Sequence, residues 1–540
     1  MATITRRTFI RGAAAAVAAA AIPALPAPTR AGGPMGGGMG GGGMGGGGMG
    51  TTVVDPPVGG ALRLLAPAAN ETPGTGVFQV SIEARRAAVD VNGTTANLLT
   101  YNGTLPGPLI RVRRDQLLRM RFTNSLPADD EVNILGDSTR VTNIHTHGLH
   151  VNPGMNMNGT CGDYMLAMAD PGDSLVYEYD LSMHPPGNLN FYHPHIHGCV
   201  TDQMWGGMSA PLIVEDEVTT LAPYAEKVLV LKDISLTGAE PTPHTSLMQY
   251  MHGLEGNTVL VNGQVNPRLT IAPGEIQRWR VLNASTARFY RLQLQGHSMY
   301  LVGTDGGLLD KPYKVSELLL SPGERADLLI VGSQKSGTYK WLSLPYDRGM
   351  MSSLQQVTLM TLAYGGARKR QSLPSVVDPS ATRVHKDLAS LPRKQIALTM
   401  AMGGMGGGGM GSGGMGSGTV GINGITYVDH EHCYMTHSTT GTWEVWEVTN
   451  GSAMDHPFHH HTNSAQVLSI TGGDAGYASL YTSLPAWKDV TIVPANGKVE
   501  LLMPVMDYAG MAMIHCHIID HEDIGMMGVW HIMGEMGGGM

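Results

Sequence analysis

The sequence predicts an all-β protein made of three β-sandwich domains, and three observations lead to this prediction. A chain of 540 residues with 42% hydrophobic residues is long enough for about three domains of ordinary size. Short segments of alternating apolar and polar residues, such as 277–282 and 443–448, are bounded by Gly, Pro and Asn, as strands between turns are. The third observation is an internal repeat.

The repeat begins with Asn-Gly pairs at 102–103, 262–263 and 423–424, which are 160 and then 161 residues apart. Each pair is followed by a segment that ends in Asn. These segments contain Arg119, Arg121 and Asn124; Arg278, Arg280 and Asn283; and Trp443, Trp446 and Asn450. A repeat of this length indicates three similar units rather than a solenoid.

The first 31 residues predict an export signal. Arg6 and Arg7 precede a short Ala-rich apolar stretch that prolines end, which is the layout of a signal peptide. The arginine pair resembles a twin-arginine signal, read by the export machinery of that type; the alternative is a chance arginine pair before a general secretory signal. We expect a periplasmic or secreted protein without a membrane span, because no other segment has 18 consecutive apolar residues.

Composition divides the rest of the chain. Gly/Met tracts cannot bury enough apolar surface to fold by themselves. The expected organisation is a signal peptide at 1–31, a flexible Gly/Met-rich segment at 32–76, domains at 77–218 and 219–366, a linker at 367–418, and a third domain at 419–540. A net charge of −9 argues against nucleic acid as a partner.

Histidines are unusually common, with 22 in the chain, and they cluster in pairs. Because residues i and i+2 of a strand share a face, His-x-His directs two imidazoles to one place; roughly one such pair is expected by chance. There are six: His145/His147, His193/His195, His195/His197, His430/His432, His459/His461 and His515/His517. We expect His430/His432 and His197 not to be ligands, because they lie outside the four histidine-rich motifs or at their edge.

The motif around Cys516 predicts a blue-copper site. His521 follows Cys516 by five residues and Met526 by ten, and His456 heads the HPFHHH motif. A thiolate, two imidazoles and a weak axial thioether form the ligand set of a copper electron-transfer site. His515 and His517 point to the opposite face of the same strand, so the thiolate is linked covalently to a second, histidine-rich site.

That second site has eight predicted imidazole ligands: His145, His147, His193, His195, His459, His461, His515 and His517. Eight neutral nitrogen donors suit three copper ions with an open position. Zinc fits any single pair, but zinc has no redox chemistry and does not explain the Cys–His link.

The four motifs HTHGLH, FYHPHIHG, HPFHHH and IHCHIIDHEDIGMM, in this order, resemble those of the multicopper oxidases. The resemblance runs from Tyr101 to Trp530 and includes SPGERADLLI in the middle domain. It implies three cupredoxin-like Greek-key domains, a structural second domain, and an oxidase that takes electrons from a phenolic donor or Cu(I) and passes them to O2. It also implies four coppers: type 1 at His456, Cys516, His521 and Met526, type 2 at His145 and His459, and a type 3 pair at the six other histidines.

Two features depart from the family pattern. His460 stands where an aliphatic residue is usual, and Thr462-Asn463 replaces Gly-His. By strand alternation we expect His460 to face away from the metal cluster.

Four further residues are predicted to have functional roles. Proton delivery needs positioned carboxyl groups; Glu522, in the HEDxGM frame of the family, and Asp163 are the candidates. Met454 and Asp455 lie where Cu(I)-oxidising relatives bind substrate, so they are candidate substrate residues.

Two rival functions are considered. One is a copper-resistance protein that sequesters copper with its Met-rich tracts, and the other is a copper nitrite reductase, which lacks the His-Cys-His link. Cys161 and Cys199 could form a disulfide in an oxidising compartment, with Cys433 left over.

Overall fold

The computed structural model describes residues 52–215, 217, 219–350, 354–401 and 419–534. The predicted signal peptide and residues 402–418 of the second Gly/Met tract lie outside the described residues. Strands dominate the described part, and its helices are short. None of these helices has the length and apolar character needed to cross a membrane.

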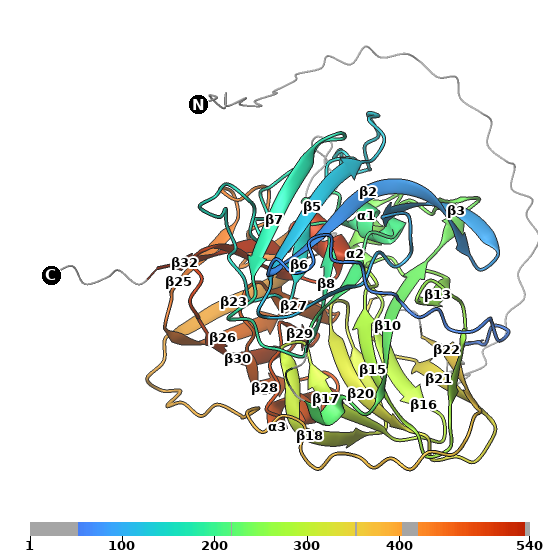
Figure 1. Cartoon of the computed structure of the whole chain (residues 1–540). Helices are drawn as coiled ribbons and strands as arrows, with labels where there is room; N and C mark the ends of the chain where they lie inside the picture. Colours follow the sequence, from blue (N-terminus) through green and yellow to red (C-terminus); the bar gives the residue numbers. More distant parts are fainter. Residues whose placement is uncertain (1–51, 216, 218, 351–353, 402–418, 535–540) are drawn as a thin grey trace, which may run out of the picture. The chain divides into compact units, whose positions relative to one another are not determined.

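The first sandwich has two four-stranded sheets (Figure 1). One has the order β3-β2-β5-β7, with β2 (Val77–Val91), β3 (Thr94–Tyr101), β5 (Leu117–Ser125) and β7 (Ser174–Asp180). The other has the order β4-β9-β8-β6, with β4 (Ile110–Val112), β6 (His145–His147), β8 (Leu189–His193) and β9 (Ala210–Val214). Apolar residues that alternate along β2 and β5, such as Ile82 and Phe122, form the core between the sheets.

The second sandwich has two six-stranded sheets. The first contains β1 (Thr52–Val54), β14 (Arg268–Ile271), β16 (Tyr290–Leu294), β19 (Leu318–Leu320), β21 (Thr338–Leu344) and β22 (Gln355–Tyr364). The second contains β10 (Ala225–Ile234), β13 (Thr258–Val261), β15 (Ile276–Asn283), β17 (Met299–Thr304), β18 (Gly307–Val315) and β20 (Arg325–Val331). A small ribbon of β11 (Leu236–Thr237) and β12 (Glu240–Pro241) stands beside them.

The third sandwich has two five-stranded sheets. One has the order β24-β23-β26-β30-β28, with β23 (Arg393–Ala401), β24 (Thr419–Ile422), β26 (Trp443–Asn450), β28 (Gln466–Thr471) and β30 (Lys498–Pro504). The other has the order β25-β32-β31-β27-β29, with β25 (Tyr434–Thr439), β27 (His456–His460), β29 (Val490–Val493), β31 (Gly510–Cys516) and β32 (Met527–Met533). Its core is continuous with that of the second sandwich.

Five short helical segments lie between the strands of the described part. They are α1 (Val200–Gly206), the 3-10 turn η1 (Thr219–Leu221), α2 (Leu247–His252), α3 (Ala475–Ser483) and α4 (Ile519–Asp523). The carboxylate of Asp523 accepts hydrogen bonds from the backbone N–H groups of Gly198 (2.8 Å) and Thr201 (2.7 Å). This contact ties the start of α1 to α4, because the first N–H groups of a helix need partners from outside the helix.

The predicted repeat recurs in three dimensions. Each unit pairs its first long strand in parallel with a later one: β2 with β5, β10 with β15 and β23 with β26. The Asn residues of the three Asn-Gly pairs have positive φ angles of 53°, 52° and 50°. Asn followed by Gly tolerates this left-handed turn better than most pairs, which explains why the same dipeptide occupies all three turns.

Two segments that composition predicts to be flexible contain strands. Thr52–Val54 pairs in parallel with β22, and Arg393–Ala401 of the predicted linker is β23, which pairs with β24 and β26. β1 pairs with a strand some three hundred residues away, and β23 pairs with two strands that follow it in the chain. Pairing with these strands gives both segments an order that their local composition does not encode. The predicted domain boundaries otherwise stay a prediction.

Candidate metal centres

One centre joins the ends of three elements. His456 begins β27, Cys516 ends β31, and His521 lies in α4. The Cys516 Sγ lies 3.4 Å from the Nδ1 of His456 and 3.5 Å from the Nδ1 of His521, and the two nitrogens are 3.2 Å apart. All three side chains are buried.

The outer ring nitrogens of this centre have partners of their own. The His456 Nε2 lies 2.8 Å from the Oγ of Ser452, and the His521 Nε2 donates to the carbonyl oxygen of Met251 at 3.2 Å. The Nδ1 lone pair of His521 is therefore left to face the sulfur. Two imidazole nitrogens and a cysteine sulfur that converge in this way are the donor types that copper prefers, so the arrangement fits a bound metal.

The backbone of Met526, directly before β32, is hydrogen-bonded to that of two members of this centre. Its carbonyl accepts a hydrogen bond from the N–H of Cys516 at 3.0 Å, its N–H donates to the carbonyl of His521 at 2.8 Å, and its side chain is buried. Burial also raises the pKa of the Cys516 thiol; a bound cation would reverse this effect by stabilising the thiolate.

The second centre lies between the first and third sandwiches and contains the eight other predicted imidazoles. Their nitrogens converge in three groups, which are His145/His147/His459, His147/His193/His517 and His195/His461/His515. Strand pairing explains the convergence, because β6 sets His145 opposite His193 on β8, and β27 sets His459 opposite His515 on β31.

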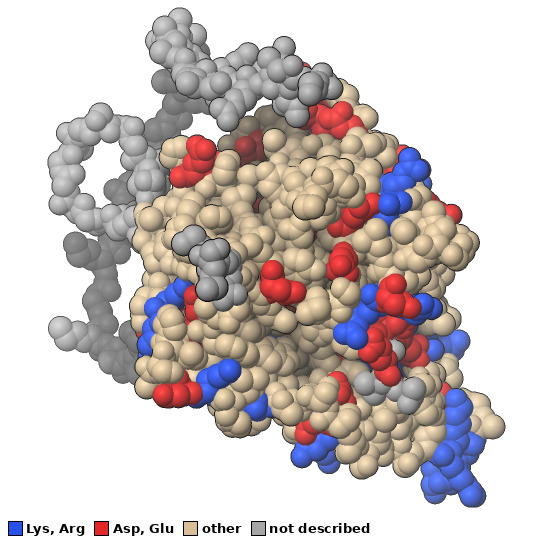
Figure 2. All heavy atoms as spheres, turned by 60° about the vertical axis from the view of Figure 1, so that its left-hand side comes forward, with Lys and Arg blue, Asp and Glu red and all other residues tan. Residues whose placement is uncertain are grey.

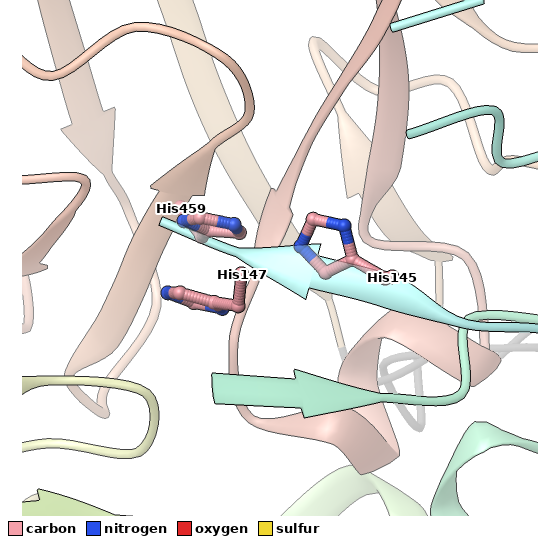
Figure 3. A group of neighbouring side chains, drawn as sticks. All are labelled: His145, His147 and His459. Carbon is pink, nitrogen blue, oxygen red and sulfur yellow. The ribbon is translucent and has the colours of Figure 1, made fainter. Parts of the chain in front are cut away.

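Figure 3 shows the first of these groups, with His145 and His147 on β6 and His459 on β27. The rings of His147 and His459 stack with centroids 3.8 Å apart and an angle of 8° between planes. Two strands more than three hundred residues apart in sequence therefore form one wall of the centre.

In the other two groups, nitrogen atoms of different rings lie within about 3.3 Å of one another. The Nε2 of His517 lies 3.1 Å from the Nδ1 of His147. The Nε2 of His515 lies 3.3 Å from that of His195 and 3.2 Å from that of His461. Each group is buried, so a bound cation would be held away from bulk water.

The outer nitrogens of this centre set the tautomers. The Nδ1 atoms of His193, His459 and His515 donate to the backbone carbonyls of Pro194 (2.8 Å), Asp489 (2.9 Å) and Cys516 (3.0 Å). The inward Nε2 atoms then carry lone pairs, and those of His145, His193 and His459 are buried without a hydrogen-bond partner. Burial lowers the pKa of His193 to about 3 and that of His195 to about 4, so these rings are neutral, as metal ligands must be.

Asp163 and Glu522 both contact the histidine groups. The Asp163 carboxylate lies 2.9 Å from the Nδ1 of His145 and accepts the N–H of Thr146 at 2.8 Å, and burial raises its pKa to about 7. The Glu522 carboxylate is fully buried and lies 3.1 Å from the Nδ1 of His515 and 3.4 Å from that of His195. Asp163 also lies 3.7 Å from the Nδ1 of His461, so both acids border the His195/His461/His515 group, and Asp163 in addition contacts His145.

Sequence reasoning missed Asp489 and Arg325. The Asp489 carboxylate lies 3.2 Å from the Nε2 of His147 and accepts two hydrogen bonds of 2.6 Å from the Arg325 guanidinium. Arg325 lies in the SPGERADLLI segment of the second sandwich. Next to it, Gly323 has a φ of +82°, and a Cβ there would lie 3.0 Å from the His517 ring. The second sandwich therefore buttresses a centre to which it gives no imidazole.

The predicted substrate residues are buried. Met454 is fully buried in the core. The Asp455 carboxylate accepts hydrogen bonds from the Tyr346 hydroxyl and from the Ala495 N–H. In the described part of the chain, neither side chain is an open surface ligand next to His456.

The histidines expected to have no metal role lie apart from both centres. The His460 Nδ1 donates to the Asn463 carbonyl at 2.7 Å, and its ring lies near Trp446. His197 packs against Tyr427, while His430 and His432 are in a loop at the surface. None of the four belongs to a group of converging donors among the described residues.

The suggested disulfide does not form. Cys161 and Cys199 are both buried free thiols, and Cys433 is a half-buried one. Cys161 packs in the core of the first sandwich, whereas the thiol of Cys199 is directed to the backbone carbonyl of Ile196. The two positions serve different local packing, which sequence spacing could not reveal.

Comparison with known proteins agrees with these centres. Three multicopper oxidase family models match residues 83–219, 224–367 and 404–534. The multicopper oxidase mco of Staphylococcus aureus is 26% identical over 81% of this chain and 84% of its own length. The laccase of Bacillus subtilis is 26% identical over 83% of this chain and 93% of its own.

Solved structures extend the likeness to the fold. A multicopper oxidase from Campylobacter jejuni, described as a metallo-oxidase, matches with a TM-score of 0.74 and 28% identity, covering 90% of this chain and 98% of that one. This likeness confirms the predicted all-β fold of three cupredoxin-like Greek-key sandwiches. The three matched segments together cover most of the sequence, and the four histidine motifs converge as copper ligands would; the chain therefore belongs to the multicopper oxidase family and is an oxidoreductase.

Proposed function

We propose that the chain is an exported, laccase-type oxidase that removes single electrons from a phenolic donor or from Cu(I) and uses four of them, with four protons, to reduce O2 to two waters. The observation that carries the proposal is the position of Cys516. Its sulfur belongs to the centre with His456 and His521, while its neighbours His515 and His517 belong to the histidine groups.

The proposed ligands are as follows. Type 1 copper would be held by His456, Cys516, His521 and Met526; type 2 by His145 and His459; and the type 3 pair by His147, His193 and His517 and by His195, His461 and His515. When bound, these four coppers supply one-electron redox chemistry and the site where O2 is reduced. The buried lone pairs of the imidazoles support this ligand set.

The polypeptide provides the electron path between the two centres. From Cys516 Sγ the path runs through one residue of backbone to His515 in one direction and to His517 in the other. The hydrogen bond from His515 Nδ1 to the Cys516 carbonyl, at 3.0 Å, adds a second connection on one side. A short, buried and rigid route of this kind suits transfer of single electrons.

Electrons would enter the first centre through His521. Its Nε2 donates to the carbonyl of Met251 in α2, so this helix lies between the ligand and an outside donor. We propose that Met454 and Asp455, which precede His456 and are both buried, support the binding site of the electron donor from behind and do not contact the donor themselves.

Protons would reach the cluster through Glu522 and Asp163. Glu522 contacts the histidine groups beside His515, and Asp163 contacts His145. A buried carboxyl with a pKa of about 7, as Asp163 has, can hold or release a proton near neutral pH. A cavity of about 900 Å³ that reaches Gly148 and His150, directly after His147, offers small reactants a way towards the cluster.

We also propose export through twin-arginine machinery to the periplasm or outside the cell, on the strength of Arg6 and Arg7. Folding around copper before export suits a protein whose cluster joins distant parts of the chain. The alternative function is a copper-resistance protein that uses its Met-rich tracts to sequester copper.

The test is oxygen consumption by the copper-loaded protein with dimethoxyphenol and, separately, with Cu(I). We expect about four coppers per chain, an intense blue absorption band, and O2 uptake at one mole per four moles of electrons. A protein that binds four coppers but takes up no O2 with either donor is a copper-binding protein, not an oxidase.

Cys516→Ser tests the electron path, with Cys433→Ser as a matched control at a cysteine outside both centres. We expect Cys516→Ser to lose the blue band and turnover but to retain the three cluster coppers. Turnover that persists in this variant would refute electron entry through Cys516.

A further inference from the structure

A row of soft metal-binding side chains crosses the outer face of the third sandwich, away from both centres. In the sheet β25-β32-β31, His437 pairs with His531, and His531 pairs with Met511 on its other side. Paired residues of neighbouring strands point to the same face. Two imidazoles and one thioether therefore stand side by side on three adjacent strands.

Burial shows which face this is. On β25 and β32 the residues next to the histidines, such as Ser438 and Ile532, are buried in the sandwich, whereas His437 and His531 are exposed and Met511 is half-buried. Met435 and Met533, on the same face and one pleat away, are 42% and 44% exposed. Two exposed methionines, the half-buried Met511 and two exposed histidines therefore share one face of the sheet.

The two imidazoles have the geometry of rings that share a ligand. Their centroids are 5.6 Å apart, with an angle of 74° between planes. His193 and His517, in one buried histidine group, are 5.6 Å apart at 77°. Small rotations about the side-chain torsions of exposed residues are enough to bring one nitrogen of each ring to a common ion.

We propose that His437, His531 and Met511 form an accessory surface site for a cuprous ion, with Met435 and Met533 as exchangeable neighbours. Thioether sulfur selects Cu(I) over hard cations, and imidazole binds copper well. The site has no carboxylate in the row, which disfavours Ca²⁺ and Mg²⁺. Its existence does not depend on the proposed oxidase activity.

The surroundings are compatible with a monovalent cation. Lys394 lies on the other face of β25, where its Nζ donates to the His437 carbonyl and the Oγ of Ser438 and pairs with Glu444. The side of the molecule that carries β25 and β32 in Figure 1 comes forward in Figure 2, where Lys and Arg are interspersed with Asp and Glu among uncharged residues.

The site is separate from the cluster. Met511, Met513 and His515 follow one another on the same face of β31, but Met513 and His515 are buried. The buried side chains of Met513 and Val529 lie between the surface row and the cluster ligand His515.

The test uses Ag(I), a redox-inert soft monovalent ion that stands in for Cu(I) and is not consumed by turnover. The copper-loaded full chain is labelled with diethyl pyrocarbonate, and modification of each histidine is followed by peptide mapping as Ag(I) is added. We expect Ag(I) to slow labelling of His437 and His531 at least fivefold and to leave the exposed control His385 unchanged. Equal labelling of all three histidines with and without Ag(I) would overturn the proposal.

Variants separate the row from other silver sites on the chain. His531→Gln should abolish protection of His437, whereas His531→Met, which retains a soft donor, should preserve it. Met511→Leu should raise the Ag(I) concentration needed for half-protection at least tenfold, while His385→Gln should have no effect. Protection of His437 that survives His531→Gln unchanged would also overturn the proposal, since the two rings would then not share an ion.

Discussion

Asp489→Asn should weaken the contact through which the second sandwich holds the histidine cluster in place. The wild-type carboxylate has a bidentate pair of 2.6 Å hydrogen bonds with Arg325, and both side chains are nearly inaccessible, at 3% and 1% exposed. The same carboxylate lies 3.2 Å from the Nε2 of His147. The asparagine amide keeps the shape but removes the charge and turns one acceptor into a donor.

The expected size follows from these contacts. Breaking a buried ion pair by neutralising one partner costs about 3–5 kcal/mol. Arg325 keeps hydrogen bonds to the carbonyls of Leu189 (2.8 Å), Gly323 (3.0 Å) and Asp305 (3.1 Å). We therefore expect a loss near the lower limit, about 3 kcal/mol in the free energy of unfolding. Loss of the carboxylate behind His147 should also lower copper affinity at the cluster roughly 10–100-fold.

The assay compares chemical unfolding of the copper-free protein with copper binding by competition. The matched control is Asp327→Asn, which removes another buried carboxylate paired with arginine, at Arg278 in the second sandwich. Both variants should be destabilised, but only Asp489→Asn should lose cluster copper. Equal copper affinity in the two variants would refute the idea that Asp489 orients His147.

Three further predictions rest on single contacts. Gly323→Ala should lower the free energy of unfolding by about 2 kcal/mol and reduce the copper content of the cluster, because φ is +82° and the new Cβ would lie 3.0 Å from the His517 ring. Chemical unfolding and metal analysis measure the two effects, and wild-type values in both would contradict this prediction. Lys232→Met should stabilise the protein by about 2 kcal/mol at pH 7, because burial lowers the pKa of this lysine to about 8. The lysine binds its proton more tightly in the unfolded chain than in the folded protein, so the stability of the wild type rises between pH 8 and 10.5. The stability difference between variant and wild type should therefore shrink over this range. A stability difference that does not change with pH would exclude burial of the charged lysine as its cause. Arg348→Met should speed amide hydrogen exchange in α2 at least tenfold, because its guanidinium bonds the carbonyls that end this helix; unchanged exchange would show that other contacts hold α2.

The convergence of the histidine pairs could be predicted because the signal for it is local. Side chains two residues apart in a strand point to the same face, so a His-x-His motif by itself predicts that two imidazoles share a face. The same rule placed Cys516 opposite His515 and His517, and the structure has this arrangement. The turns were equally readable, since Asn-Gly is one of the few dipeptides that accepts positive φ at low cost.

The residues that hold the histidines in place could not be predicted, because they come from segments that are far apart in the sequence. Arg325 of the second sandwich pairs with Asp489 of the third, and nothing in the sequence around either residue indicates that the other is its partner. The partner of His521 is the backbone carbonyl of Met251, and any residue type could provide a carbonyl. Strand β23 was hidden for a similar reason, since its partners β24 and β26 are contributed by later parts of the chain.

The division of the histidine groups between β6 and β8 at one end of the chain and β27 and β31 at the other has a consequence for biosynthesis. A nascent chain that has not yet reached β31 and α4 lacks His515, Cys516, His517 and His521, so it cannot form either predicted centre. Copper uptake by the proposed cluster would therefore follow synthesis of the third sandwich and its docking against the first. The bound ions would then link segments that are more than three hundred residues apart in the sequence, and they would stabilise the folded state because they bind it and not the unfolded chain.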